Sequence, residues 1–407
     1  MAKKLKLNKE VRLRHHFFAW LNRTVVANII RSKYNFKGEI IKKRRHTPQL
    51  VLVNHQSELD PFFVYYVYKA PIYVVANEQI TTNPFYGPLL KAFMNAVPIR
   101  KGTMDLKVIR RLKQIVSENG SILLFPEGNS TYDGQLCFHL HNPGKLVKLL
   151  NIEVVIYNLQ GAYLSNPRWS RFRKKGPTYG LIKRVITKEE IAQYSLEELE
   201  TIIKENLDVN PYEINTPYKG SKIAEGLQRL IFFCPHCHHL DTLETNENII
   251  HCQNCSFKGV YDEFGYLTIN NKKYMLHEVS RPMIDEFEKY LLKNIKIQFN
   301  ENVATKVCWG KRRRRLYENI SFLLNKDGLS LIGKKINFQI PFNKIIGFGC
   351  QQKAKLVIYA NGIPTLIIRF EKNISIYKYY IVLQIFSELA KKGEENYELL
   401  THTNLSF

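Results

Sequence analysis

Between residues 49 and 125 the sequence alternates short β-type apolar runs with a segment of helical periodicity. The apolar runs are Gln49 to Val53, Pro71 to Ala76 and Ser121 to Phe125, and the helical pattern spans Asp105 to Glu118. Strands that alternate with helices are typical of α/β domains. The pattern therefore predicts an α/β domain with a mixed sheet flanked by helices, which a helix from Leu196 to Asn206 closes.

The first apolar run ends just before a histidine and an aspartate, His55 and Asp60. Residues five apart on a straight helix lie about 140° apart around its axis, so these two side chains can touch only across a bend. Residues 56–58, Gln-Ser-Glu, suit such a strand-to-helix turn. A carboxylate in contact with an imidazole fixes its tautomer and leaves the other ring nitrogen to deprotonate a hydroxyl. The alternative is a capped turn without chemistry.

The third apolar run repeats this arrangement. It delivers Glu127 and Gly128 to one edge of the predicted sheet, where a glycine permits close approach to a ligand. Arg100 and Lys101 follow another apolar segment and are suitable cations for binding phosphate. These residues predict a site for a substrate that carries a phosphate group.

In their order and spacing, the motifs resemble those of the glycerophospholipid acyltransferase family, which makes phosphatidic acid from lysophosphatidic acid. They are Asn54-His55 with Asp60, Ile99-Arg100, and Phe125-Pro126-Glu127-Gly128, and the match covers roughly residues 10 to 210. The resemblance implies that a substrate hydroxyl attacks an acyl thioester of coenzyme A or acyl carrier protein. It makes His55 the general base and Asp60 its orienting partner. It also makes Arg100 a ligand of the acceptor phosphate, in a site that Lys101, Glu127 and Gly128 complete.

Two departures from the family pattern weaken the identification of the acceptor. The family commonly has an arginine where this chain has Ser130, and Glu153 lies in the segment 152–162, where the family usually has a proline. Lys101 or the basic stretch 168–175 could replace the missing arginine, although that stretch could equally be a solvated loop facing a membrane. Acylation of another lysophospholipid or glycolipid remains an alternative, as does a non-catalytic membrane-binding protein.

Four cysteines form two C-x-x-C pairs, Cys234 with Cys237 and Cys252 with Cys255, separated by 14 residues. Two such turns can place four thiolates tetrahedrally around one Zn²⁺. A hairpin pattern follows at Gly259, so the segment resembles a zinc ribbon. We expect one structural Zn²⁺ here, with a redox dithiol, an iron site or no metal as the alternatives.

The rest of the chain predicts a small β-rich domain. A helix from His277 to Lys296 is followed by a series of short β-type runs, the first at Ile320 to Leu324 and the last at Thr365 to Phe370, and by a terminal helix from Ser375 to Lys391. This order is typical of a pleckstrin-homology-like or related small barrel. The predicted domains are an acyltransferase domain over residues 1–215, a zinc ribbon over residues 216–275 and the β-rich domain over residues 276–407.

The charge of the chain predicts an anionic partner. The formal net charge is +24, and residues 1–50 contribute 14 − 2 = +12 of it. Nucleic acid and acidic lipid headgroups attract such a field equally well. The cluster Lys311 to Arg315 and the zinc ribbon favour nucleic acid, but the acyltransferase motifs favour an anionic membrane surface, and no nucleic acid is expected.

The N-terminal region predicts how the protein meets that membrane. Asn8 to Arg31 has the pattern of an amphipathic helix, which either packs on its own domain or lies in the membrane interface. We find no signal peptide pattern and no run of about 20 apolar residues. The expected location is therefore cytoplasmic, peripheral on the inner face of the membrane.

Overall fold

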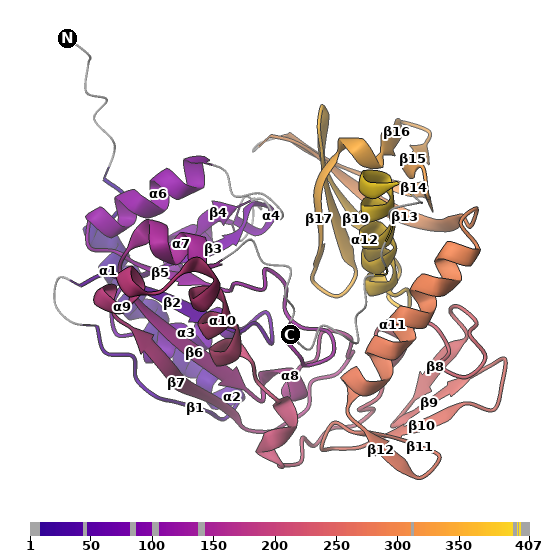
Figure 1. Cartoon of the computed structure of the whole chain (residues 1–407), viewed down its shortest axis with the longest axis horizontal. Coiled ribbons are helices and arrows are strands. Elements are labelled where there is room, and N and C mark those ends of the chain that lie inside the picture. The colour runs from indigo at the N-terminus through magenta and orange to yellow at the C-terminus, as the bar shows by residue number, and fades with distance from the viewer. Residues whose placement is uncertain are drawn as a thin grey trace. The chain divides into compact units, whose positions relative to one another are not determined.

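The structure is a computed structural model that describes residues 9–43, 47–81, 87–99, 106–136, 143–310, 313–393, 397 and 399. The chain divides into two compact units, and Figure 1 labels many of their helices and strands. Unit 1 comprises residues 1–131, 135–165 and 176–214. Unit 2 comprises residues 132–134, 166–175 and 215–407, so two short segments from the first half of the chain belong to it.

Unit 1 is built on a seven-stranded mixed sheet. In order across the sheet, the strands are β1 (Phe36–Gly38), β7 (Thr178–Ile186), β6 (Glu153–Gln160), β2 (Gln49–Val53), β5 (Ser121–Leu124), β3 (Ile72–Asn77) and β4 (Val97–Ile99). Strand β2 is parallel to β5 and β6, and β6 is antiparallel to β7. Because β2 and β5 are parallel neighbours, the residues that follow them meet at one edge of the sheet. The predicted α/β class with a mixed sheet is confirmed.

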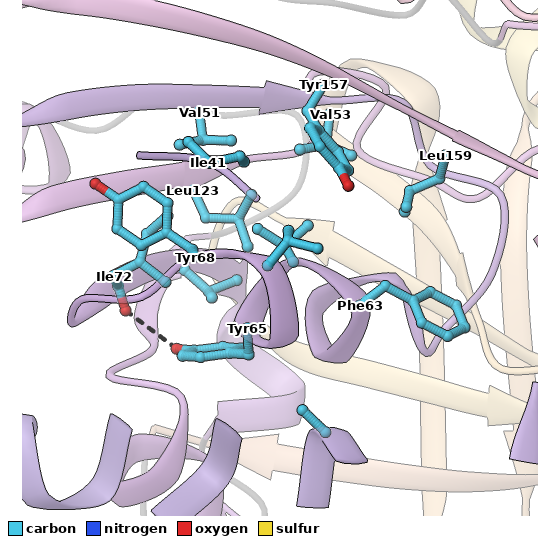
Figure 2. Packing of buried hydrophobic residues seen from close by; sticks show 14 of the residues in the cluster. Ile41, Val51, Val53, Phe63, Tyr65, Tyr68, Ile72, Leu123, Tyr157 and Leu159 are labelled. Carbon is cyan, nitrogen blue, oxygen red and sulfur yellow. Dashed lines mark hydrogen bonds between the residues drawn. The ribbon is translucent and has the colours of Figure 1, made fainter. Parts of the chain in front are cut away.

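Helices cover both faces of this sheet. One face carries α2 (Ala27–Lys33) and α3 (Asp60–Val67), and the other carries α6 (Leu106–Ser117), α7 (Pro143–Leu150), α9 (Lys188–Gln193) and α10 (Leu196–Leu207). Along β2, Val51 and Val53 pack in the first layer while Leu50 and Leu52 pack in the second. Figure 2 shows the first layer, where the Tyr65 hydroxyl donates to a backbone carbonyl at 3.1 Å. Burial on both faces explains why β2 is apolar throughout.

The remaining short elements of unit 1 connect these layers. They are α4 (Glu78–Thr81), α5 (Gly87–Phe93), α8 (Ala162–Ser165) and the 3₁₀ turn η2 (Pro211–Ile214).

The N-terminal helix differs from the predicted single α-helix. It consists of α1 (Leu13–Leu21), a π-helical turn η1 (Asn22–Val26) and α2. Its exposed apolar side chains form a stripe, which we call the apolar stripe: Leu13, Phe17, Trp20, Val25 and Ile29. The step of five from Trp20 to Val25 falls in the π turn, which takes in one extra residue. In an uninterrupted α-helix that extra residue would rotate the second half of the stripe by about 100°, so the π turn keeps the stripe on one side.

Unit 2 contains two antiparallel sheets. The first follows chain order: β8 (Leu243–Asn246), β9 (Ile249–Cys252), β10 (Lys258–Tyr261), β11 (Leu267–Ile269) and β12 (Lys272–Tyr274). Strands β10 and β11 form the hairpin expected after Gly259. A 3₁₀ turn, η3 (Leu227–Arg229), precedes this sheet, and α11 (Leu276–Lys293) follows it.

The second sheet of unit 2 has seven strands in the order β16-β15-β14-β13-β19-β18-β17. Their bounds are β13 (Phe299–Trp309), β14 (Arg313–Asn325), β15 (Gly328–Gly333), β16 (Ile336–Pro341), β17 (Ile345–Gln351), β18 (Lys355–Ala360) and β19 (Ile363–Arg369), with a 3₁₀ turn η4 (Phe342–Lys344) before β17. The terminal helix α12 (Ile376–Lys392) packs against β17 and β18. This confirms the small β-rich domain with one terminal helix.

Candidate active site

The candidate site begins where β2 ends. Asn54 joins this strand end to β6, because its side-chain amide donates to the carbonyl oxygen of Leu159 at 2.9 Å and its side-chain oxygen accepts from the Leu159 N–H at 2.7 Å. The chain then bends over residues 55–59 before α3 starts at Asp60. The two hydrogen bonds fix the direction from which His55 leaves the sheet.

The bend brings the carboxylate of Asp60 onto the imidazole of His55. Oδ2 of Asp60 lies 2.9 Å from Nδ1 of His55 and also accepts the backbone N–H groups of Gln56 and Ser57 at 2.6 and 2.9 Å. Oδ1 accepts the Ser57 hydroxyl at 2.7 Å. The Asp60 side chain is fully buried. Four hydrogen-bond donors thus surround this one buried carboxylate and fix its position.

This carboxylate determines the tautomer of His55. An ionised carboxylate only accepts hydrogen bonds, so the proton of the neutral imidazole resides on Nδ1 and Nε2 carries the lone pair. Within the described residues Nε2 has no hydrogen-bond partner, and the His55 side chain is 19% exposed. The Phe125 ring packs on the imidazole with centroids 4.6 Å apart. Asp60 and Phe125 thus hold the imidazole in place, and none of the described residues hydrogen-bonds to its basic nitrogen.

The loop after β5 makes hydrogen bonds to both the N–H and the carbonyl oxygen of His55. The Glu127 carboxylate accepts the His55 N–H at 2.5 Å, and the Thr131 N–H donates to the His55 carbonyl at 2.9 Å. Gly128 has a φ of +63°, and a Cβ built there would meet nothing within 4 Å. Glycine is therefore required by the backbone conformation and not by crowding.

The structure brings together four of the residues predicted for the site: His55, Asp60, Glu127 and Gly128. Arg100 and Lys101 lie outside the described residues. Ser130, which stands where the family commonly has an arginine, is buried.

One interpretation of the basic stretch 168–175 makes it a solvated loop, and the structure shows that this is wrong for two of its residues. Arg168 and Lys174 are buried within unit 2. The Lys174 ammonium donates to the Tyr261 hydroxyl at 2.9 Å and lies over the Trp169 ring. Burial lowers the pKa of Lys174 to about 7.

Sequence reasoning treated Gln56 and Ser57 as turn residues and missed their part in the site. The Gln56 side chain is buried and its oxygen accepts the N–H of Tyr163, the second residue of α8, at 3.2 Å. The spacing between His55 and Asp60 does not show where the side chains between them point. Only the polarity of Gln56 and Ser57 could have suggested a role for them.

The four cysteines of the C-x-x-C pairs form one cluster in unit 2. Their sulfur atoms all lie within 4.8 Å of one another. Sγ of Cys234 is 3.7 Å from that of Cys255, and Sγ of Cys237 is 3.7 Å from that of Cys252. Four thiolates bound tetrahedrally to one ion at about 2.3 Å would be about 3.8 Å apart. The cluster therefore has the dimensions of a metal site.

Comparison with protein families identifies the class of unit 1. Residues 34–157, which lie within this unit, match the family model described as Acyltransferase. A solved structure similar to the chain is the 1-acyl-sn-glycerophosphate (LPA) acyltransferase PlsC from Thermotoga maritima, at 16% identity and a TM-score of 0.39, covering 50% of this chain and 89% of that one.

A second similar structure is the N-terminal PH domain of human ARAP2, at 14% identity and a TM-score of 0.18, covering 24% of this chain and 83% of that one. Comparison with curated protein sequences finds no match. None of the helices in the described part of the chain combines the length and apolar character needed to span a bilayer.

Proposed function

We propose that this protein transfers a fatty acyl chain from a thioester of coenzyme A or acyl carrier protein to the free hydroxyl of lysophosphatidic acid, which gives phosphatidic acid. The observation that carries the proposal is the buried carboxylate of Asp60 at 2.9 Å from Nδ1 of His55, while Nε2 has no hydrogen-bond partner among the residues that the structure describes. An acyltransferase domain over residues 34–157 supports the reaction class.

In this reaction Nε2 of His55 accepts the proton of the substrate hydroxyl as its oxygen attacks the thioester carbonyl. The Asp60 carboxylate stabilises the imidazolium that forms. The tetrahedral intermediate collapses by breaking the carbon–sulfur bond, and the proton held by His55 passes to the departing thiolate. The products are an ester and a free thiol. A thiolate leaves readily, so general-base catalysis and positioning of the two substrates supply most of the required chemistry.

The phosphate of the acceptor is proposed to bind Arg100 and Lys101, beside Glu127 and Gly128. The open space around Gly128 supports close approach of a substrate there. The Glu127 carboxylate already accepts the His55 N–H, so its proposed part in substrate binding is to hold the loop and not to contact an anionic phosphate.

The proposed place of work is an anionic membrane surface. The apolar stripe is exposed on α1, η1 and α2, while another side of the same helix packs on unit 1 through His15, which bonds the Tyr73 hydroxyl at 2.7 Å, and Phe18, which contacts Phe93. Arginines along this helix suit acidic headgroups. One side of the helix thus supports packing on its own domain, and the exposed apolar stripe supports contact with the membrane interface.

The cysteine cluster is proposed to hold one structural Zn²⁺. Four thiolates at tetrahedral spacing suit zinc, and a site whose four positions are all filled by protein leaves none for substrate. When bound, the ion would cross-link the loop before β8 to the end of β9 and the turn after it. It takes no part in acyl transfer.

The test is release of free thiol from acyl-coenzyme A in anionic vesicles that contain lysophosphatidic acid, comparing wild type with His55→Ala. Release that requires both the acceptor and His55 supports the proposal. Release that persists in His55→Ala would reject the assigned base.

A second candidate is acylation of a different lysophospholipid, which the buried Ser130 favours because one phosphate contact of the family is missing. A panel of lysolipids in the same assay separates the two candidates. Silence with every lysolipid and both acyl carriers would indicate a non-catalytic membrane-binding protein.

A further inference from the structure

The chain leaves unit 1 directly after the loop that grips His55. The Thr131 N–H donates to the His55 carbonyl at 2.9 Å, and the next three residues, 132–134, belong to unit 2. The chain is back in unit 1 at Gln135. The active-site loop is therefore continuous, at its downstream end, with a segment that packs elsewhere.

Unit 2 holds this first segment through charge and aromatic contacts. Oδ2 of Asp133 lies 2.8 Å from Nε of Arg281 on α11, and the two side chains are only 11% and 17% exposed. The Tyr132 ring stacks on Tyr377 of α12, with centroids 4.0 Å apart and planes at 18°. The Arg168 guanidinium lies over the same Tyr132 ring at 4.7 Å. Removing one partner of a pair shielded from water in this way costs more than breaking an exposed pair, because the other charge is left uncompensated.

The chain leaves unit 1 a second time after α8, whose Tyr163 N–H holds the Gln56 side chain. Residues 166–175 then belong to unit 2, where the Trp169 ring is fully buried and meets Tyr261 of β10 edge to face at 5.4 Å. The loop of residues 127–131 hydrogen-bonds to His55, and Tyr163 of α8 hydrogen-bonds to Gln56. Each of these segments continues directly into residues that belong to unit 2.

We propose that unit 2 is a positioning module for the acyl-transfer site, with Arg281 and Tyr377 as positioning residues. They fix Asp133 and Tyr132 and, through this short connection, hold the loop of residues 127–131 against His55. Ordering a loop costs about 1–2 kcal/mol per residue in backbone entropy, and anchored ends offset part of that cost before substrate binds. The inference rests on the proposed function for its kinetic consequence but not for its structural one.

The kinetic test compares Arg281→Gln and Arg281→Lys with wild type in the thiol-release assay. Lys273→Gln is the matched control, because Lys273 also pairs with a carboxylate of unit 2, Asp262 at 3.2 Å, but is 63% exposed and far in sequence from both anchored segments. We expect Arg281→Gln to lower kcat at least tenfold with each KM within about twofold. Arg281→Lys should recover part of the loss, and Lys273→Gln should behave as wild type.

The structural test is amide hydrogen exchange, which needs no activity. In Arg281→Gln the Thr131 amide should exchange at least tenfold faster, while the amides of β2 keep their wild-type rates. If Arg281→Gln disrupts unit 2, Tyr377→Leu provides the same test through the aromatic stack.

Thr131 exchange that stays at the wild-type rate in folded Arg281→Gln and Tyr377→Leu would overturn the inference, as would faster exchange confined to unit 2. A wild-type protein that releases no thiol would refute the proposed function, and the exchange data would still decide this inference.

Discussion

Asp60→Asn tests the assigned general base most sharply, because the side chain keeps its shape and loses only its charge. The amide oxygen can still accept the hydrogen bonds now made to Oδ2, and the Ser57 hydroxyl can turn to accept from the new amide. When Nε2 takes a proton, however, no carboxylate faces the imidazolium. For charges about 4 Å apart at an effective dielectric of about 20, Coulomb's law gives about 4 kcal/mol.

A proton only partly transferred in the transition state realises part of that energy, so we expect kcat to fall about 10²- to 10³-fold. KM should remain near wild type, because Asp60 is fully buried. The measurement is steady-state thiol release, with melting temperature recorded to show that the fold survives. Ser57→Ala is the control, since it removes the 2.7 Å hydrogen bond to Oδ1 but leaves the charge. A folded Asp60→Asn protein with kcat within threefold of wild type would refute the role assigned to the carboxylate.

Three further predictions concern the metal, the membrane and pH. Elemental analysis should find about one zinc per chain. Cys252→Ser should lose the zinc and much of the thermal stability of unit 2, because metal binding at such sites contributes folding free energy. Zinc-free protein that melts like wild type would contradict this. The pair Phe17→Ser and Ile29→Ser should weaken binding to anionic vesicles at least 100-fold, at about 1.5–3 kcal/mol per side chain, while Val185→Ser, also exposed in unit 1, should not. Burial and then nearby arginines lower the pKa of His15 from 6.5 to about 4, so the free energy of unfolding should decrease as pH falls from 6.5 to 4. His15→Gln should abolish that part of the slope, and an unchanged slope would disprove it.

The sequence was most informative where one physical effect dominated. Strand β2 was predicted with its observed bounds because burial on both faces leaves an uninterrupted apolar run. Contact between His55 and Asp60 was predicted because helical geometry requires a bend between them, and the bend is present.

Features that depend on long-range register could not be predicted in the same way. The bond from the His55 N–H to Glu127 joins residues 72 apart and exists because β2 and β5 are parallel neighbours. Lys174 looked like a solvated cation because composition does not show that two aromatic rings enclose its ammonium. Strand β13 was missed because the polar run of residues 300–302 near its start obscures the alternation that follows.

The assignment of residues 132–134 to unit 2 also sets the timing of assembly on the ribosome. The stacking contact of Tyr132 cannot form until Tyr377 has been synthesised, which is 377 − 132 = 245 residues later. At about 5–20 residues per second, that delay lasts between about 10 and 50 seconds. The last strand of the unit 1 sheet, β7, ends at Ile186, so for most of this interval all seven strands of that sheet have been made while Tyr377 has not. We therefore expect nascent chains stalled before α12 to lack the contact between Tyr132 and Tyr377, so the segment that follows the His55 loop gains this anchor only when synthesis is nearly complete.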